Sequence, residues 1–173
     1  MQFFSGYSLQ NESYLFKDYI NDTKYTVVGF SYGAIKALEY VNKTLAAKKR
    51  VDTLQLLSPA FFQTRDAKFK RLQLLSYTKS EIVYIKQFIK LCFDPYEKKI
   101  VEQKKSTKEE LEELLNYEWD LDELESLVKK GVKIEVYLGE KDKIIDVEGA
   151  RDFFTQVSSV TYIKKANHFL QIQ

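Results

Sequence analysis

Five short runs of apolar or alternating residues are spaced along the chain and separated by segments with helical periodicity. The runs are Gln2–Phe4, Tyr25–Val28, Thr53–Leu57, Ile134–Leu138 and Val160–Ile163. They are rich in β-branched and aromatic residues and are bounded by turn residues, which is typical of strands. Strands that alternate with helices favour a mainly parallel sheet, so we predict an α/β fold with five strands.

The segments between the strands predict the helices. Ile35, Leu38 and Val41 form one apolar stripe after Gly33, and a further helix is expected over 11–20. Because right-handed crossovers between strands that progress in one direction lie on one side, the connecting helices should cover one face of the sheet. The other face should be thinly covered, and therefore either partly exposed or used in a homodimer.

The interval between Pro59 and Gly131 has no strand pattern, and we predict a helical insertion at about residues 60–118. Residues typical of helix starts and ends recur in this region: Ser80, the capping-box pair Thr107 and Glu110, Asp120 and Gly131. The insertion has too few apolar residues for a core of its own. We therefore predict a single domain over residues 1–173, with the insertion as a lid.

Composition and charge narrow the class of protein. The 173 residues are 45% hydrophobic and 30% charged with only 6 Gly and 2 Pro, which is typical of a globular chain. The net charge of +2 gives no support for nucleic-acid binding. Cys92, the single cysteine, lies in an apolar helical run, which indicates a buried thiol and a reducing compartment. With no signal peptide and no membrane-length apolar run, the expectation is a soluble, cytoplasmic protein.

The pattern Gly29-Phe30-Ser31-Tyr32-Gly33 follows an apolar strand and begins a helix. It is the G-x-S-x-G nucleophile elbow in the required strand-turn-helix context. A serine on a sharp turn projects its hydroxyl outward, and side chains two residues away on either side would collide with neighbouring backbone. The alternative is an ordinary glycine-rich turn with a helix-capping serine.

His168 is the only histidine and follows the last predicted strand, so it lies at the same edge of the sheet as Ser31. A purely structural histidine is the alternative. The acid that orients the histidine should come between the two in chain order, and Asp142 after the strand 134–138 fits. Glu140 and Asp146 are rivals, although Asp146 is also a natural N-cap for the next helix.

Stabilisation of a developing oxyanion needs two N–H donors. The first candidate is the amide of Tyr32, and the second is the amide of Tyr7 in the turn after the first strand. Ser5 and Ser8 in this turn are equally compatible with capping the helix that follows. One His and one Cys give no zinc-ligand spacing, and no glycine-rich phosphate loop is present, so no metal and no cofactor are expected.

Ser31, Asp142 and His168 in this order resemble the α/β-hydrolase triad. The chain is more specifically similar to the short ε-proteobacterial carboxylesterases of the biotin pathway (BioV-like), which demethylate pimeloyl-acyl carrier protein methyl ester. The segments that carry this likeness are Phe3–Gly6, Asn11–Ser13, Gly29–Ala37, Ser58-Pro59, Phe69–Leu74 and Gly131–Val136. The sequence departs from the general hydrolase pattern, because Ser5-Gly6 stands in place of His-Gly, early strands are missing, and only five residues follow His168.

The resemblance implies a serine carboxylesterase that acts on pimeloyl-acyl carrier protein methyl ester. Another small acyl hydrolase (thioesterase or esterase) and a non-catalytic hydrolase-fold binding module are the alternatives. The insertion is basic over 65–90, with seven Lys and Arg against two acidic residues, and acidic over 106–125, with nine against one. Acidic acyl carrier protein should therefore dock on the basic part. The residues expected there are the outward-facing Lys68 and Arg71, with Phe62, Phe69, Leu72 and Leu75 lining an acyl channel.

Overall fold

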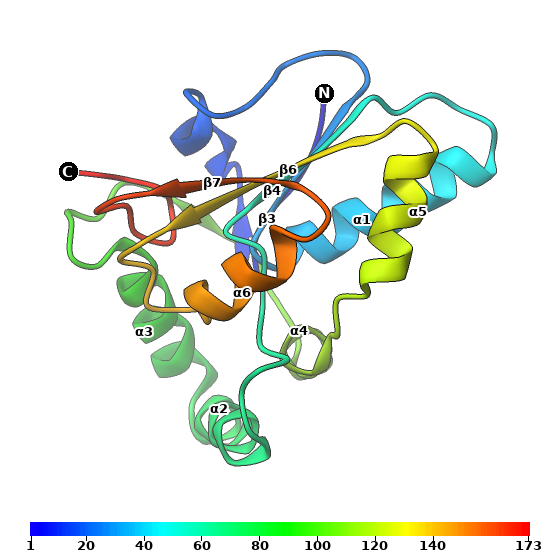
Figure 1. Ribbon diagram of the computed structural model, residues 1–173. Helices are drawn as coiled ribbons and strands as arrows, with labels where there is room; N and C mark the ends of the chain where they lie inside the picture. Colours follow the sequence, from blue (N-terminus) through cyan, green and yellow to red (C-terminus); the bar gives the residue numbers. More distant parts are fainter.

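A five-stranded parallel sheet forms the centre of the computed structural model, which describes residues 1–173 (Figure 1). The strands are β1 (Gln2–Phe4), β3 (Thr26–Phe30), β4 (Thr53–Leu57), β6 (Lys133–Gly139) and β7 (Ser159–Ile163). They lie side by side in chain order, and every neighbouring pair is parallel. The five predicted strands are confirmed, with boundaries that shift by at most two residues.

Three helices connect these strands and lie on one face of the sheet, below the strands in Figure 1. They are α1 (Tyr32–Ala46), α5 (Leu121–Lys129) and α6 (Val147–Phe154). Helix α1 packs on β1, β3 and β4, whereas α5 packs on β6 and α6 packs on β6 and β7. The three crossovers from β3 to β7 therefore lie on one face, as expected for crossovers of one hand between strands that progress in one direction.

The opposite face is covered only in part. The 3₁₀ helix η1 (Glu12–Phe16) places Phe16 4.8 Å from Phe30, measured between ring centroids, and Tyr19 lies 5.7 Å from Tyr137. Ser159 and Thr161 on β7 are exposed. The predicted α-helix over 11–20 is therefore wrong: Asn11 has a left-handed backbone, and the segment forms a short 3₁₀ turn that fits over the strands.

The helical insertion lies between β4 and α5. It contains α2 (Ala67–Lys79), α3 (Glu81–Phe93), the short strand β5 (Glu102–Gln103) and α4 (Lys108–Asn116). The predicted caps are confirmed, because Ser80, Thr107 and Asp120 each accept hydrogen bonds from the first turn of the following helix. Strand β5 was not predicted. It pairs antiparallel with β2 (Leu9–Gln10), and two residues are too few to show a strand period.

None of the helices has the length and apolar composition needed to span a lipid bilayer.

The core is continuous from the sheet into the insertion, and it includes the completely buried Cys92 thiol on α3. Burial raises the pKa of this thiol well above its ordinary value. Cys92 therefore behaves as a small apolar side chain, as the sequence predicts.

Candidate active site

Ser31 occupies a strained turn between β3 and α1. Its backbone has φ 53° and ψ −118°, a conformation that L-residues rarely adopt. A side chain at Gly29 would overlap the backbone of Gly33 and Ala34, and one at Gly33 would overlap the carbonyl of Phe4. Both glycines are thus required by close approach, as the motif predicts. The Ser31 side chain makes no capping hydrogen bond to α1, which removes the alternative of a helix-capping serine.

The Ser31 hydroxyl faces the only imidazole in the chain. Ser31 Oγ lies 3.0 Å from His168 Nε2, and His168 Nδ1 lies 2.6 Å from Asp142 Oδ2. The second Asp142 oxygen, Oδ1, accepts the N–H groups of Ile144 at 2.7 Å and Ile145 at 3.3 Å, which fixes the carboxylate plane. The structure therefore joins the three residues proposed from the sequence in one chain of hydrogen bonds.

The side chains of this hydrogen-bonded chain are buried. Ser31 is 4% exposed and His168 is completely buried, next to the ring of Phe30. The insertion contributes much of the wall of the cavity into which Ser31 opens, and this accounts for the burial. A substrate therefore reaches Ser31 through the insertion side of the molecule, and a buried network of this kind is stronger than one in water.

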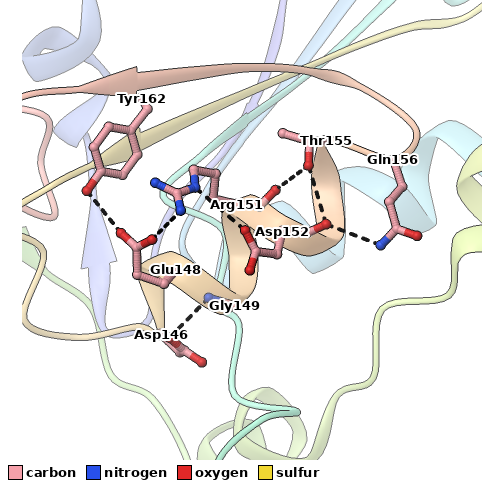
Figure 2. Close-up of polar contacts among 8 residues, drawn as sticks. All are labelled: Asp146, Glu148, Gly149, Arg151, Asp152, Thr155, Gln156 and Tyr162. Carbon is pink, nitrogen blue, oxygen red and sulfur yellow. Dashed lines mark hydrogen bonds and ion pairs between the residues drawn. The ribbon is translucent and has the colours of Figure 1, made fainter.

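The two rival carboxylates are used elsewhere. Asp146 accepts the N–H of Gly149 at 3.2 Å, so it is the N-cap of α6 (Figure 2), and it also accepts the Thr64 hydroxyl at 2.6 Å. Glu140 accepts the N–H of Lys165 at 2.9 Å. Of the three carboxylates considered, only Asp142 contacts His168.

Two backbone N–H groups beside Ser31 have no hydrogen-bond acceptor. Tyr32 is the first residue of α1, where no intrahelical acceptor exists, and the Tyr7 amide makes no hydrogen bond. Tyr7 and Ser31 line the same cavity, and the close approach of Gly33 to Phe4 holds the turn after β1 against the start of α1. Both predicted oxyanion donors are thus unpaired and close to the serine in the fold.

Glu12 is a buried acid that the sequence did not single out. It is 0% exposed, its Oε1 accepts the Gly6 N–H at 2.7 Å, and its Oε2 has no partner. Burial raises the pKa of Glu12, and the hydrogen bond from Gly6 offsets this only in part. The carboxyl group therefore braces the turn that carries Tyr7 at the cost of burying an incompletely paired charge.

The raised pKa of Glu12 predicts how stability depends on pH. Between the unfolded and folded pKa values the unfolded chain has released a proton that the folded chain keeps, so wild-type stability falls as pH rises through this window. Glu12→Gln keeps the Oε1 acceptor and removes the titration. We expect it to raise Tm by a few degrees at pH 8 and to have little effect at pH 4, measured by calorimetry. An equal shift at both pH values would contradict this account.

The cavity over Ser31 has a volume of about 260 Å³, and ten of its fifteen lining residues are hydrophobic. Phe62 and Phe69 line it as predicted, together with Phe88 of α3 and three leucines of α4. Leu72 and Leu75 do not line it and are 50% and 53% exposed. The prediction that these two leucines line the channel is therefore wrong.

The helical period explains this difference. On α2, Leu72 and Leu75 share one stripe with the exposed Lys68 and Arg71, whereas Phe69 and Gln73 occupy the stripe that faces the cavity. Lys68 and Arg71 face solvent, as expected. The exposed face of α2 therefore combines two cations with two apolar side chains.

A polar cluster connects the insertion to the helix that follows Ser31. Glu113 of α4 accepts the Tyr32 hydroxyl at 2.5 Å and the Lys36 ammonium at 2.6 Å. Burial disfavours the ionised form of Glu113, but the hydrogen bonds from Lys36 and Tyr32 outweigh this and lower its pKa. The negative charge is thus retained near neutral pH and holds α4 against the first turns of α1.

No group of three or more His, Cys, Asp or Glu side chains is arranged to bind a metal ion.

The sequence analysis did not identify Asn167, which is completely buried beside His168. Its position next to the only histidine was the one available signal. Glu12 gave no signal, because its partner at Gly6 is revealed only by the path of the turn.

No protein-family model matches this chain, and no curated protein sequence is significantly similar to it. Solved structures are similar in fold. Carboxylesterase NP, a naproxen esterase from Bacillus subtilis, aligns with a TM-score of 0.53 at 19% identity, over 85% of this chain and 54% of that one. Carboxylesterase CesB from Bacillus subtilis gives a TM-score of 0.55 at 18% identity, with the same coverage of 85% and 54%. The chain thus spans about half the length of these two esterases.

BioG from Haemophilus influenzae matches over nearly the full length of both proteins. The alignment has a TM-score of 0.57 at 12% identity and covers 98% of this chain and 88% of BioG. Identities this low establish architecture and leave activity open. The parallel sheet, the strained turn at Ser31 and these likenesses together show that the chain has a reduced α/β-hydrolase fold.

Proposed function

We propose that this protein is a serine carboxylesterase that hydrolyses the methyl ester of pimeloyl-acyl carrier protein methyl ester to pimeloyl-acyl carrier protein and methanol. The observation that carries the proposal is the hydrogen-bonded chain of Ser31, His168 and Asp142, which opens into an apolar cavity. A serine on a strained turn with an imidazole at 3.0 Å is the arrangement that acyl transfer requires.

In the first half of the reaction, Ser31 Oγ attacks the ester carbonyl carbon while His168 Nε2 takes the hydroxyl proton. The carbonyl oxygen becomes an oxyanion, and the free N–H groups of Tyr7 and Tyr32 are the donors that stabilise it. His168 then returns the proton to the departing methoxide, which leaves as methanol. Asp142 holds the Nδ1–H tautomer and stabilises the imidazolium that forms.

In the second half, water attacks the acyl-serine carbonyl and gives its proton to His168. Collapse of the second tetrahedral intermediate breaks the acyl–oxygen bond and returns the proton to Ser31, which releases the free acid. Each half moves one proton through the same imidazole, so the chain's own side chains account for both steps.

The cavity favours a medium-length acyl group. Its volume of about 260 Å³ lies just below the range of roughly 300–1,000 Å³ common for ligand pockets, and its wall is mostly apolar. The specific substrate rests on the likeness to the short esterases of the biotin pathway. The match to BioG over almost the whole chain is compatible with a small esterase of this kind. If the substrate is attached to acyl carrier protein, the enzyme is expected to act in the cytoplasm.

The carrier is proposed to dock on the exposed face of α2, defined by Lys68, Arg71, Leu72 and Leu75. Lys68→Glu combined with Arg71→Glu is expected to raise KM for the carrier-bound ester about tenfold at low salt, and less at high salt, because rim charges act through screened steering. Hydrolysis of a small chromogenic ester should remain unchanged, because that substrate does not contact this face. An equal loss of activity toward both substrates would mean that Lys68 and Arg71 only maintain the structure of the insertion.

The decisive experiment for the function is mass spectrometry of the carrier-bound methyl ester before and after incubation with the protein. Loss of one methyl group supports the proposal, and labelling of Ser31 by a fluorophosphonate identifies the nucleophile. Labelling together with hydrolysis of free esters alone would indicate a generic acyl hydrolase. Absence of both labelling and hydrolysis would indicate a binding module, and the proposal would fail.

A further inference from the structure

The loop that carries His168 is closed by one buried amide side chain. Asn167 Oδ1 accepts the Gln171 N–H at 3.0 Å, and its Nδ2 donates to Gln171 Oε1 at 2.9 Å. The backbone N–H of Asn167 also donates to the Gln171 carbonyl at 3.0 Å. Residues 167–171 therefore form a tight turn with His168 inside it, and both residues at its ends are buried.

The same amide connects this loop to the insertion. Asn167 Nδ2 donates to the carbonyl of Phe93, the last residue of α3, at 2.7 Å. The Phe93 carbonyl lies at the end of the helix, where no intrahelical partner is available, and it accepts both this amide and the backbone N–H of Tyr96 at 2.8 Å. The partners are 74 residues apart in sequence, and a part of the insertion thus supports a loop of the hydrolase core.

Two further contacts join the end of α3 to the loop. The rings of Phe93 and Phe169 pack with their centroids 4.4 Å apart. The hydroxyl of Tyr96, in the turn after α3, donates to the Lys165 carbonyl at 2.6 Å. The end of α3 therefore contacts the loop on both sides of His168.

We propose that Asn167 and Tyr96 are positioning residues, which orient His168 by tying its loop to the end of α3. The insertion then has a second role besides covering the cavity, because it holds the base in register with Ser31 and Asp142. Alignment of this kind matters kinetically, since a displacement of about 1 Å can reduce the rate about a hundredfold. The kinetic part of the inference rests on the proposed esterase function.

Two variants and one control test the proposal. Asn167→Ala removes the amide, and Tyr96→Phe removes one hydroxyl while it keeps the ring. Tyr14→Phe is the matched control, because it removes a Tyr hydroxyl bond of the same type to the insertion, from Tyr14 to the Ile100 carbonyl at 2.5 Å, away from the histidine loop. Chromogenic ester hydrolysis gives kcat and KM. NMR of the ring of His168 is unambiguous because the chain has one histidine.

We expect kcat to fall about fivefold in Tyr96→Phe, the factor that corresponds to one hydrogen bond, and about a hundredfold in Asn167→Ala, with KM unchanged. The downfield proton signal of the His168–Asp142 hydrogen bond should broaden in both variants and stay sharp in Tyr14→Phe. If Asn167→Ala does not fold, the kcat and the His168 signal of Tyr96→Phe still decide whether the proposal holds. An unchanged His168 signal and kcat in Tyr96→Phe, or equal effects in Tyr14→Phe, would overturn the proposal.

The NMR readout needs no turnover. If the wild-type protein hydrolyses no ester, the proposed function fails. In that case the His168 signal still shows whether Asn167 and Tyr96 orient the imidazole, so the two failures can be told apart.

Discussion

Ser31→Ala is expected to lower kcat for ester hydrolysis by about 10⁴- to 10⁶-fold without loss of the fold. The hydroxyl caps no helix, and its one side-chain hydrogen-bond partner is His168. Its removal therefore deletes the nucleophile and leaves the packing of β3 and α1 intact. Steady-state kinetics measure the loss, and an unchanged Tm confirms that the fold survives.

The histidine needs a different substitution, because His168 is completely buried against Phe30 and Phe169. Truncation to alanine would leave a cavity and destabilise the core, whereas His168→Gln fills most of the space. We expect His168→Gln to be as inactive as Ser31→Ala, and the double variant to be barely slower than either single one, because the two side chains act as a unit. Multiplicative losses in the double variant would contradict the proposed mechanism.

The elbow and the strands could be predicted because their signals are local. Gly29 and Gly33 are required by backbone contacts within the strand-turn-helix unit itself and from the neighbouring β1. The caps at Ser80 and Thr107 likewise involve atoms three residues apart. For Gly29 and the two caps the residues that form the interaction are neighbours in sequence, so the local pattern contains the whole cause. The contact of Gly33 with Phe4 is long-range, and the glycine is indicated there only by the motif as a whole.

The cavity-facing side of α2 could not be predicted in this way. The helix has apolar residues on several stripes, among them Phe69, Leu72 and Leu75. Its own period therefore does not say which stripe is buried. The choice is made by α3 and α4, which pack against α2 on the side of Phe69.

Buried polar groups were missed for a related reason. Gln55 is completely buried on β4, where it bonds the backbone of Tyr19 and Asn21 and the carboxylate of Glu135. Its partners come from two distant parts of the chain, and Asn167 likewise bonds Phe93, 74 residues away. A polar residue in a strand pattern indicates an exposed face, and only the tertiary structure reveals that its hydrogen bonds are satisfied inside.

The choice of Asp142 as the acid leads to the second large expected effect. Asp142→Asn is expected to lower kcat about 10⁴-fold and to change KM little. Oδ1 already accepts two backbone N–H groups, from Ile144 and Ile145, so the amide oxygen of the new residue will keep that position. The amide NH₂ group must then face His168 Nδ1, where Oδ2 now lies at 2.6 Å.

An NH₂ donor at this position makes Nδ1 the acceptor and moves the imidazole proton to Nε2. A protonated Nε2 cannot take the proton of Ser31, so the base is held in the wrong tautomer while every backbone contact survives. Asp146→Asn is the matched control, because asparagine also caps helices and the α6 cap does not touch His168. Its kcat should stay within about twofold of wild type, as expected for a cap that makes no contact with the triad. Greater damage from Asp146→Asn than from Asp142→Asn would require the acid to be reassigned.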